Sequence, residues 1–351
     1  MKALIQRQSL ITQAAALLRG ELERGTWREF LPGERQLAVQ MGISRPTLRG
    51  ALECLAAEGW LTRVHGRPTR ITRPASTTPA RRTQVILLSP VPLREMPPLM
   101  VCWVDELREK LAAAEHALEL LTLPAAFGPD GEKSLKHLEK RGQEAVWLLH
   151  LAPERVQRWF AQRGFPCLVA GSAAPGVELP SVDLDHRATC RHAGGLLAAK
   201  GKTRPVLLLP DTHAPGDKES EQGFLEGYTR QAGKPLILRH DGTVEGLCAQ
   251  VSAAARGRAP ADAFVVGRSA HALTVLTCLL GEGCRVPGEV AVISRDDDLF
   301  LAHTTPEMAR YASDPSKWAR VIFKCLLQLM EGVPLRTQHR LVPDFIRGGT
   351  L

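Results

Sequence analysis

Two arginines, Arg45 and Arg49, lie four residues apart in the segment that follows Ser44. Residues at this spacing are neighbours on one face of an α-helix. A guanidinium group presents a planar set of N–H donors, which can grip a phosphate or form a paired contact with O6 and N7 of guanine. The same two residues could equally form a charged, solvated helix face, so their surroundings must decide between the two interpretations.

The distribution of charge along the chain favours contact with nucleic acid. The 351 residues carry a formal net charge of +8, and residues 1–82 contain 14 Lys and Arg against 6 Asp and Glu. The whole surplus therefore lies in this segment, because residues 83–351 contain 31 basic and 31 acidic residues. A basic block beside a neutral body is typical of a nucleic-acid-binding module, although a basic membrane-surface module would have a similar composition.

The basic block also has the pattern of a small folded domain. Apolar residues recur at helical spacing, and Ser44 and Pro46 suit the N-cap and first turn of a helix. Gly66 and Arg67 lie in a turn between two short apolar runs, which predicts a β-hairpin. The expected elements are helices over 9–24, 34–41 and 44–59 and strands over 60–64 and 69–72. This order describes a winged helix-turn-helix over residues 1–73.

Residues 31–71 read LPGERQLAVQMGISRPTLRGALECLAAEGWLTRVHGRPTRI and resemble the GntR family of winged-helix regulators. The family pattern is roughly LPSERELA, then GVSRxTVRxAL, then EGLL and a glycine-containing wing. Gly33 replaces the usual Ser, which removes one phosphate contact, and Pro68 and Arg70 replace Gly and Phe in the wing. The resemblance implies double-stranded DNA as partner, with the third helix in the major groove. The candidate DNA contacts are Arg35, Ser44, Arg45, Thr47, Arg49, Gly66 and Arg67.

The remaining chain changes its pattern. Residues 74–83 are expected to form a polar, Pro-bounded linker, and residues 84–351 alternate short apolar strands with helices. This alternation predicts an α/β fold with parallel sheets covered on both faces, and the length suffices for two sheets with a cleft between them. Strands are expected over 85–89, 118–123, 145–150, 166–171, 179–183, 205–210, 235–239, 263–267, 289–294 and 338–347. Helices are expected over 99–115, 130–141, 153–163, 186–200, 219–232, 245–256, 270–282 and 314–331.

The second region resembles the effector domains of LacI-type regulators, which share the fold of periplasmic sugar-binding proteins (type I). The segments that carry the resemblance include QGFLEGYTR, LVPDFIRGG and GCRVPGEVAVISRDDD. In that family the first acidic residue after the last of these strands, here Asp296, hydrogen-bonds sugar hydroxyls. Ser220 and Arg268 depart from the family, since a pocket arginine is usual at the first position and Asn at the second. Arg268 would suit a carboxylate or phosphate on the effector, or would pair with Asp296 and close an empty cleft.

Ser89 and His150 complete the candidate effector site. Each follows an expected strand, and open α/β sheets usually bind ligands outside the carboxyl ends of their strands. The alternative is that both are ordinary strand-end polar residues. The implied effector is a carbohydrate or sugar derivative; a cleft that has lost ligand binding is the other interpretation.

Other function classes find little support in the sequence. No G-x-S-x-G, H-E-x-x-H or P-loop pattern is present, and no lysine motif matches the aminotransferase-like domains that some GntR-type proteins carry. We therefore expect no enzyme activity, no cofactor and no metal, and eight cysteines that remain thiols. No apolar run is long enough to cross a membrane and no signal peptide is evident, so we expect a cytoplasmic protein without a membrane partner. The families imply a homodimer, a pseudo-palindromic operator and a repressor.

Overall fold

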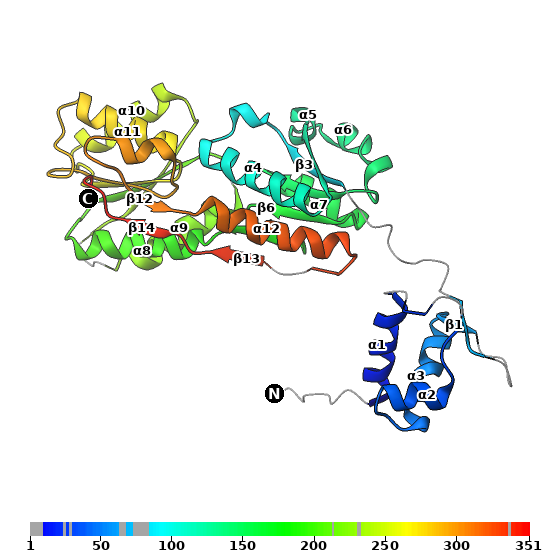
Figure 1. Ribbon diagram of the computed structural model, residues 1–351. Helices are drawn as coiled ribbons and strands as arrows, with labels where there is room; N and C mark the ends of the chain where they lie inside the picture. Colours follow the sequence, from blue (N-terminus) through cyan, green and yellow to red (C-terminus); the bar gives the residue numbers. More distant parts are fainter. Residues whose placement is uncertain are drawn as a thin grey trace. The chain divides into compact units, whose positions relative to one another are not determined.

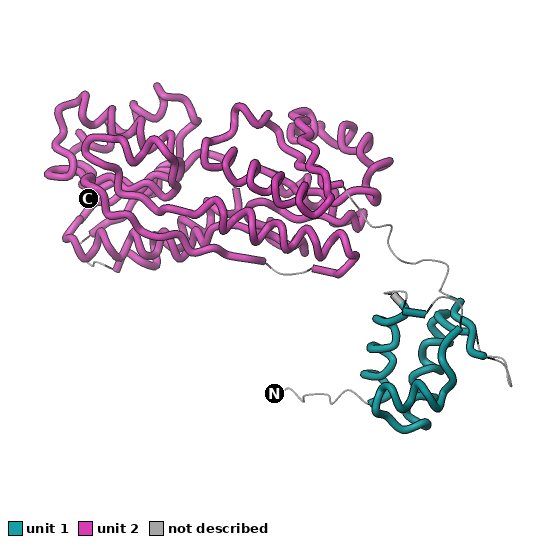
Figure 2. The backbone as a smooth tube through the Cα atoms, in the orientation of Figure 1, with its two compact units in different colours: residues 1–79 teal, residues 80–351 magenta. Residues whose placement is uncertain are grey.

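The computed structural model describes residues 10–23, 26–27, 30–62, 68–72, 84–212, 214–229, 233–335 and 338–351. The chain divides into two compact units, Met1–Pro79 and Ala80–Leu351 (Figure 2). The expected linker, 74–83, lies outside the described residues. Among those that are described, no helix is long and apolar enough to cross a membrane.

The first unit is a three-helix domain with a small hairpin. Its helices are α1 (Leu10–Glu23), α2 (Glu34–Gln40) and α3 (Arg45–Ala57), and its strands β1 (Leu61–Thr62) and β2 (Arg70–Ile71) pair antiparallel. Apolar side chains recur at helical spacing along each helix, so each helix has one apolar face, and this face is buried. The buried core includes Ala14, Leu18, Leu22, Leu37, Leu48, Leu52, Leu55, Leu61 and Ile71.

The turn between α2 and α3 sets the angle at which α3 is presented. Gly42 has a φ of +63°, a conformation that favours glycine, and it ends α2. Ser44 then caps α3, with its side-chain oxygen accepting the backbone N–H of Thr47 at 3.3 Å. Gly50 lets α1 approach closely, because a Cβ there would lie 2.9 Å from Ile11 Cδ1.

The second unit contains two lobes, each built on a six-stranded sheet. In the first lobe the strand order is β13-β7-β6-β5-β3-β4, and all pairs are parallel. Its strands are β3 (Gln84–Ser89), β4 (Ala117–Thr122), β5 (Val146–His150), β6 (Cys167–Ala170), β7 (Ser181–Leu184) and β13 (Gln338–Leu341). Its α-helices are α4 (Pro98–Ala113), α5 (Pro124–Phe127), α6 (Glu132–Lys136), α7 (Glu154–Arg163) and α12 (Pro315–Met330).

The second lobe has the strand order β14-β12-β11-β10-β8-β9, with only β14 antiparallel to its neighbour. Its strands are β8 (Pro205–Pro210), β9 (Leu236–His240), β10 (Ala263–Val266), β11 (Ala291–Ser294), β12 (Ala309–Ala312) and β14 (Asp344–Ile346). Its α-helices are α8 (His186–Ala199), α9 (Pro215–Gly227), α10 (Val244–Arg256) and α11 (Ser269–Gly281).

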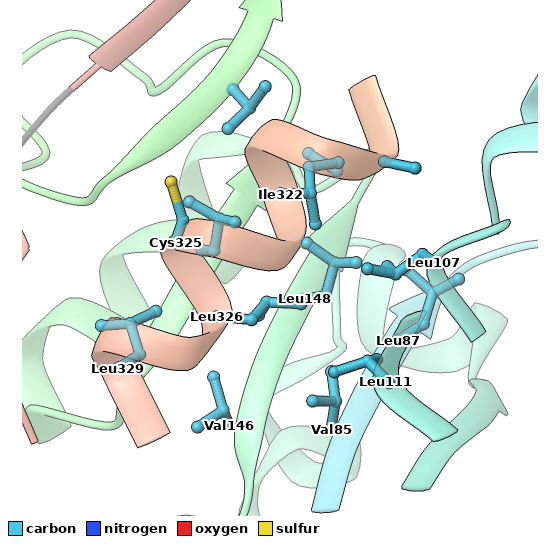
Figure 3. Packing of buried hydrophobic residues seen from close by; sticks show 14 of the residues in the cluster. Val85, Leu87, Leu107, Leu111, Val146, Leu148, Ile322, Cys325, Leu326 and Leu329 are labelled. Atoms are coloured by element: carbon cyan, nitrogen blue, oxygen red, sulfur yellow. The ribbon is translucent and has the colours of Figure 1, made fainter. Parts of the chain in front are cut away.

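Helices cover both faces of each sheet, as the continuous apolar strands predict. In the first lobe α4 and α12 pack on one face, where Leu107 and Ile322 lie beside Leu87 and Leu148 (Figure 3). The other face is covered by α5, α6 and α7. In the second lobe α8 and α9 cover one face and α10 and α11 the other (Figure 1).

The chain passes between the lobes three times. The third passage lies inside the segment near the C-terminus that was predicted to be one strand. The single strand expected over 338–347 is two strands, β13 in the first lobe and β14 in the second. The residues between them, Val342 and Pro343, break the pairing because proline cannot donate to a ladder. Strand β12 was not predicted, and the helix expected over 130–141 is the short α6 followed by a 3₁₀ turn over Glu139–Arg141. Helix α9 begins four residues earlier than predicted, with Pro215 in its first turn.

Glycines allow α8 and α9 to pack with their backbones nearly touching. A Cβ on Gly223 of α9 would lie 2.1 Å from the carbonyl oxygen of Arg187 on α8, and a Cβ on Gly194 of α8 would lie 2.7 Å from that of Phe224. Because the obstructing atoms belong to the backbone, the two helices must move apart to accept a larger residue.

Substitution of Gly223 should therefore destabilise the second lobe. We expect Gly223→Ala to lower the free energy of unfolding by about 1–3 kcal/mol or more, as for other overpacked cores. The control is Gly281→Ala at the exposed end of α11, where no atom lies within 4 Å of the added Cβ. That variant should be neutral or gain up to about 1 kcal/mol from helix propensity. Urea unfolding of both variants measures the difference, and equal effects would refute the close contact.

Candidate DNA-binding surface and ligand cleft

The N-terminal end of α3 is an exposed polar surface. Ser44, Arg45 and Arg49 are exposed and Thr47 is half-buried, while Leu48 is buried. The hydroxyl oxygens of Ser44 and Thr47 lie 2.7 Å apart, which fixes both side chains at the start of the helix. The predicted contacts on α3 are therefore at least partly accessible around its N-terminal turns, and Arg35 is exposed on α2. The predicted contacts Gly66 and Arg67 lie outside the described residues.

Glu34 forms an ion pair with Arg49, a contact that was not predicted from the sequence. Arg49 Nε lies 2.9 Å from Glu34 Oε2, and 55% of the arginine side chain stays exposed. Because the contact uses Nε, the two terminal nitrogens can still reach outward. Glu34 comes directly before Arg35 at the start of α2, so its acidic charge in a basic segment was the available signal.

The carboxyl edges of the two sheets of the second unit face each other. Burial raises the pKa of Asp298, just after β11, and the backbone N–H of Leu99, at the start of α4 in the first lobe, lies close enough to that carboxyl group to oppose this shift. A Cβ on Gly216, in the first turn of α9, would lie 3.4 Å from Ser172 Oγ, just after β6. Both contacts join segments that follow strand ends, so the strand ends of the two lobes face each other.

Ser89 and His150 meet at this edge of the first lobe. Ser89 Oγ accepts the backbone N–H of Val91 at 3.2 Å and lies 3.1 Å from His150 Nδ1. Either the serine hydroxyl donates to Nδ1 or a protonated Nδ1 donates to the serine oxygen, since that oxygen can accept twice. Burial lowers the pKa of His150 to about 4, so the ring stays neutral at physiological pH. The other ring nitrogen of His150 is then a donor in the first tautomer and an acceptor in the second.

In the second lobe a buried guanidinium organises the edge of the sheet. Arg295, directly after β11, is 1% exposed, and its Nη1 lies 2.8 Å from both Asp217 Oδ1 and Ser220 Oγ. Its Nε lies 3.0 Å from Asp296 Oδ1. Ser220 is itself fully buried and donates to the carbonyl oxygen of Gly216 at 2.8 Å. Arg295 therefore stands between Ser220 and the cleft.

Arg268 completes a cluster of two arginines and two aspartates. Its Nη2 lies 3.4 Å from Asp217 Oδ2 and its Nη1 3.5 Å from Asp296 Oδ2. Arg268 is 35% exposed and Asp296 24% exposed at the side chain, whereas the Arg295 and Asp217 side chains are each 1% exposed. The inner pair is thus a buried scaffold, and Arg268 and Asp296 are the members that a ligand can reach.

The cluster is electrically balanced without a ligand. Burial raises the pKa of Asp296, but the charges of Arg295 and Arg268 outweigh burial and lower that pKa to about 2. The same two arginines lower the pKa of Asp217 against the opposing effect of burial. Arg268, Ser220 and Asp296 were predicted from the sequence as site residues, whereas Arg295 and Asp217 were not. Asp217 lies three residues before Ser220, and Arg295 directly precedes Asp296.

An open hollow lies between the two lobes. Its volume is about 640 Å³, and it is lined by residues of the β6–β7 loop, the first turns of α9 and strand β13. The ion pair of Arg340 on β13 with Glu219 on α9 crosses the hollow and joins the two lobes. The hollow does not contain Ser89, His150, Arg268 or Asp296, so it is a feature separate from the predicted effector residues.

Family models match both units. Residues 10–71 match the model of bacterial regulatory proteins of the gntR family, and residues 195–351 match a periplasmic binding protein-like domain. The chain is 41% identical over 63 residues to the fatty acid metabolism regulator protein of Haemophilus influenzae, which covers 16% of this chain and 26% of that protein. The chain thus spans about a quarter of the length of such curated relatives.

Solved structures share the fold of the second unit. A LacI-family regulatory protein from Chloroflexus aggregans aligns with a TM-score of 0.66 at 18% identity, covering 76% of this chain and 98% of that one. The transcriptional regulator CelR in complex with cellobiose aligns with a TM-score of 0.66 at 18% identity, covering 91% of this chain and 100% of that one.

The first unit is therefore similar to bacterial regulatory proteins of the gntR family. The second unit is similar to periplasmic binding protein-like domains and has the fold of solved LacI-family regulators.

The buried charge of Arg295 leads to a stability prediction. Asp217→Asn removes one of its two carboxylate partners, and breaking a buried ion pair typically costs about 3–5 kcal/mol. The control is Glu221→Gln, also on α9, whose ion pair with Arg239 is partly exposed and should contribute only about 0–1 kcal/mol. Chemical unfolding at neutral pH compares the two variants. A loss for Asp217→Asn no larger than for the control would contradict the scaffold role.

Proposed function

We propose that this protein is a dimeric repressor that binds double-stranded operator DNA through α3 and responds to a small molecule held between the lobes of its second unit. The observation that carries the proposal is the accessible N-terminal end of α3, where Arg45, Thr47 and Arg49 follow the capping Ser44. The N-terminal residues of such a helix reach base edges in the major groove. Action on chromosomal DNA would place the protein in the cytoplasm.

The Glu34–Arg49 contact supports a role for Arg49 in reading bases. A guanidinium held at Nε keeps its terminal nitrogens in a defined plane, which suits the paired acceptors O6 and N7 of guanine. The dimer is proposed because winged helices of this kind pair on pseudo-palindromic sites, where each half-site receives one α3.

A carbohydrate or sugar derivative is the proposed effector. Arg268 offers several N–H donors, Asp296 is a carboxylate acceptor, and the free ring nitrogen of His150 can donate or accept, a combination that suits hydroxyl and anionic groups on one ligand. Binding between the lobes would favour one arrangement of them. Coupling of only about 1.4 kcal/mol to the operator-bound state would change operator affinity tenfold.

A second candidate is a regulator whose cleft binds no ligand. The mutual ion pairs of Arg268, Asp296, Asp217 and Arg295 favour this alternative, since the cluster is neutral and paired as it stands. Thermal melting with neutral sugars, sugar acids and sugar phosphates separates the two candidates, because a ligand that binds the native state must raise the melting temperature.

Loss of Arg49 should weaken operator binding. A duplex selected by the full chain from a random library supplies the target, and we expect Arg49→Ala to lose roughly 1–3 kcal/mol per half-site and to relax base preference there. The matched control is Arg19→Ala, which removes the same charge from an exposed pair with Glu58 on the same unit. If both variants bind DNA equally well and with the same base preference, α3 is not the helix that contacts the bases.

Loss of Asp296 should uncouple the effector from DNA. Asp296→Asn keeps the side-chain shape but removes the charge that accepts ligand hydroxyls, so any ligand found by melting should lose its effect on operator affinity. Operator affinity without ligand should equal that of the wild type. Asp344→Asn on β14 makes the same charge change at an exposed position and should respond normally. A full response in Asp296→Asn would place the ligand elsewhere.

A further inference from the structure

His240 is a buried histidine with one ring nitrogen unused. It is the last residue of β9 and is 1% exposed. Its Nδ1 accepts the backbone N–H of Gly242 at 3.1 Å, so the neutral ring carries its proton on Nε2. This Nε2 is buried and has no hydrogen-bond partner among the described residues. An unsatisfied buried donor is costly, which makes the position a candidate for an external acceptor.

His271, in the first turn of α11, lies against His240. The two ring centroids are 4.4 Å apart and the rings are perpendicular. The Nδ1 of His271 is likewise buried with no partner in the described parts of the chain. Two unused imidazole nitrogens therefore occur side by side at the carboxyl edge of the second lobe.

Arg268 and the end of α11 add positive potential at this place. Arg268 occupies the N-cap position of α11, and its side chain makes no capping hydrogen bond. A helix N-terminus attracts anions through its free N–H groups and its dipole. The contacts of Arg268 with Asp217 and Asp296 are long, at 3.4 and 3.5 Å. Of the two guanidinium groups in the cluster, that of Arg268 can therefore turn toward a ligand more easily.

The charged groups around the histidines keep both rings neutral when the site is empty. Burial, His271 and Arg268 lower the pKa of His240 to about 4, against the opposite effects of Asp241 and Asp217. Burial and Arg268 lower the pKa of His271, against Asp296. The remaining acidic group is Asp298, whose carboxylate bonds Ser269 at the start of α11. An arriving dianion would reverse the balance and favour protonation of the rings.

We propose that His240, His271, Arg268 and the N-terminal end of α11 form a binding site for a tetrahedral oxyanion, the phosphate group of a phosphorylated effector. This rests on the proposed function, because it makes the anionic end of the cleft ligand a phosphate monoester. His240 donates through Nε2, His271 takes up a proton and donates through Nδ1, and Arg268 turns from the carboxylates. Three donors, one at the end of β9 and two at the start of α11, match the three terminal oxygens of a phosphate better than the two of a carboxylate. A metal is not indicated, since no group of three His, Cys, Asp or Glu that could hold one occurs among the described residues.

Calorimetric titration of the full chain with sulfate and inorganic phosphate, without DNA or sugar, tests the site. Sulfate keeps its charge between about pH 6 and about pH 8, so any change in its affinity reports the protein's own protons. We expect saturable binding of both anions with proton uptake, and sulfate affinity that falls as the pH rises and the histidines lose their protons. His271→Gln should weaken sulfate binding by at least about tenfold and reduce its pH dependence, because one of the two titrating rings is lost. The control His137→Gln, at an exposed position of the first lobe, should behave as the wild type.

A second measurement does not depend on a variant. In the wild type, the ring NMR signals of His240 and His271 should shift saturably with sulfate and titrate at a higher pH in its presence. The absence of saturable binding at about pH 6, or equal binding by His271→Gln and the wild type, would overturn the site. Such a failure would leave operator binding and a neutral-sugar effector intact. Failure of operator binding, in turn, would not affect anion binding to the isolated protein.

Discussion

The buried guanidinium of Arg295 is the interaction on which the arrangement of the cleft depends. A charge that is 1% exposed is tolerated only when partners surround it, and here Asp217, Asp296 and Ser220 do so. These partners come from α9 and from the end of β11, so the charge fixes the position of one element relative to the other. Arg295 engages both carboxylate oxygens of Asp296, Oδ1 through Nε at 3.0 Å and Oδ2 through Nη2 at 3.3 Å.

This constraint explains how the cleft departs from that expected for a neutral sugar. Ser220 stands where the LacI-type pattern has a pocket arginine, and the guanidinium of Arg295 reaches Ser220 Oγ from a different element. The positive charge is therefore retained but lies beneath the surface of the cleft. Arg268 is the cation that remains within reach of a ligand, and the two unused histidine nitrogens lie beside it. We propose an anionic ligand group at this site for this reason.

The two units use charge in opposite ways. The larger unit balances its acidic and basic residues and pairs the buried ones, whereas the first 82 residues carry the whole surplus of +8. Exposed Arg45 and Arg49 on α3 display part of that surplus, which suits the strongly negative surface of duplex DNA.

Much of the fold and part of the candidate site could be predicted from the sequence, and the features that were not predicted were missed for physical reasons. The winged helix was predictable because Ser44, Gly42 and the apolar stripe of α3 act locally. The family resemblance and the apolar strands were enough to predict the two-sheet fold. The Arg295–Asp217 contact joins residues 78 positions apart, and no local pattern reports which way an arginine after a strand will turn. The division of the last predicted strand into β13 and β14 was not predicted because apolar and polar residues continue to alternate across Pro343. The pairing of Arg49 with Glu34 was missed because it depends on the angle between two helices.

The most direct test of the account is the salt dependence of duplex binding by the full chain, followed by fluorescence anisotropy with a duplex selected from a random library. If the positive face of α3 enters the major groove, several phosphates are neutralised per dimer. The logarithm of the association constant should then fall linearly with the logarithm of salt concentration, losing at least about 100-fold between about 50 and 200 mM. Affinity that is absent, or that does not change over this range, would contradict the central claim that this protein is a DNA-binding regulator.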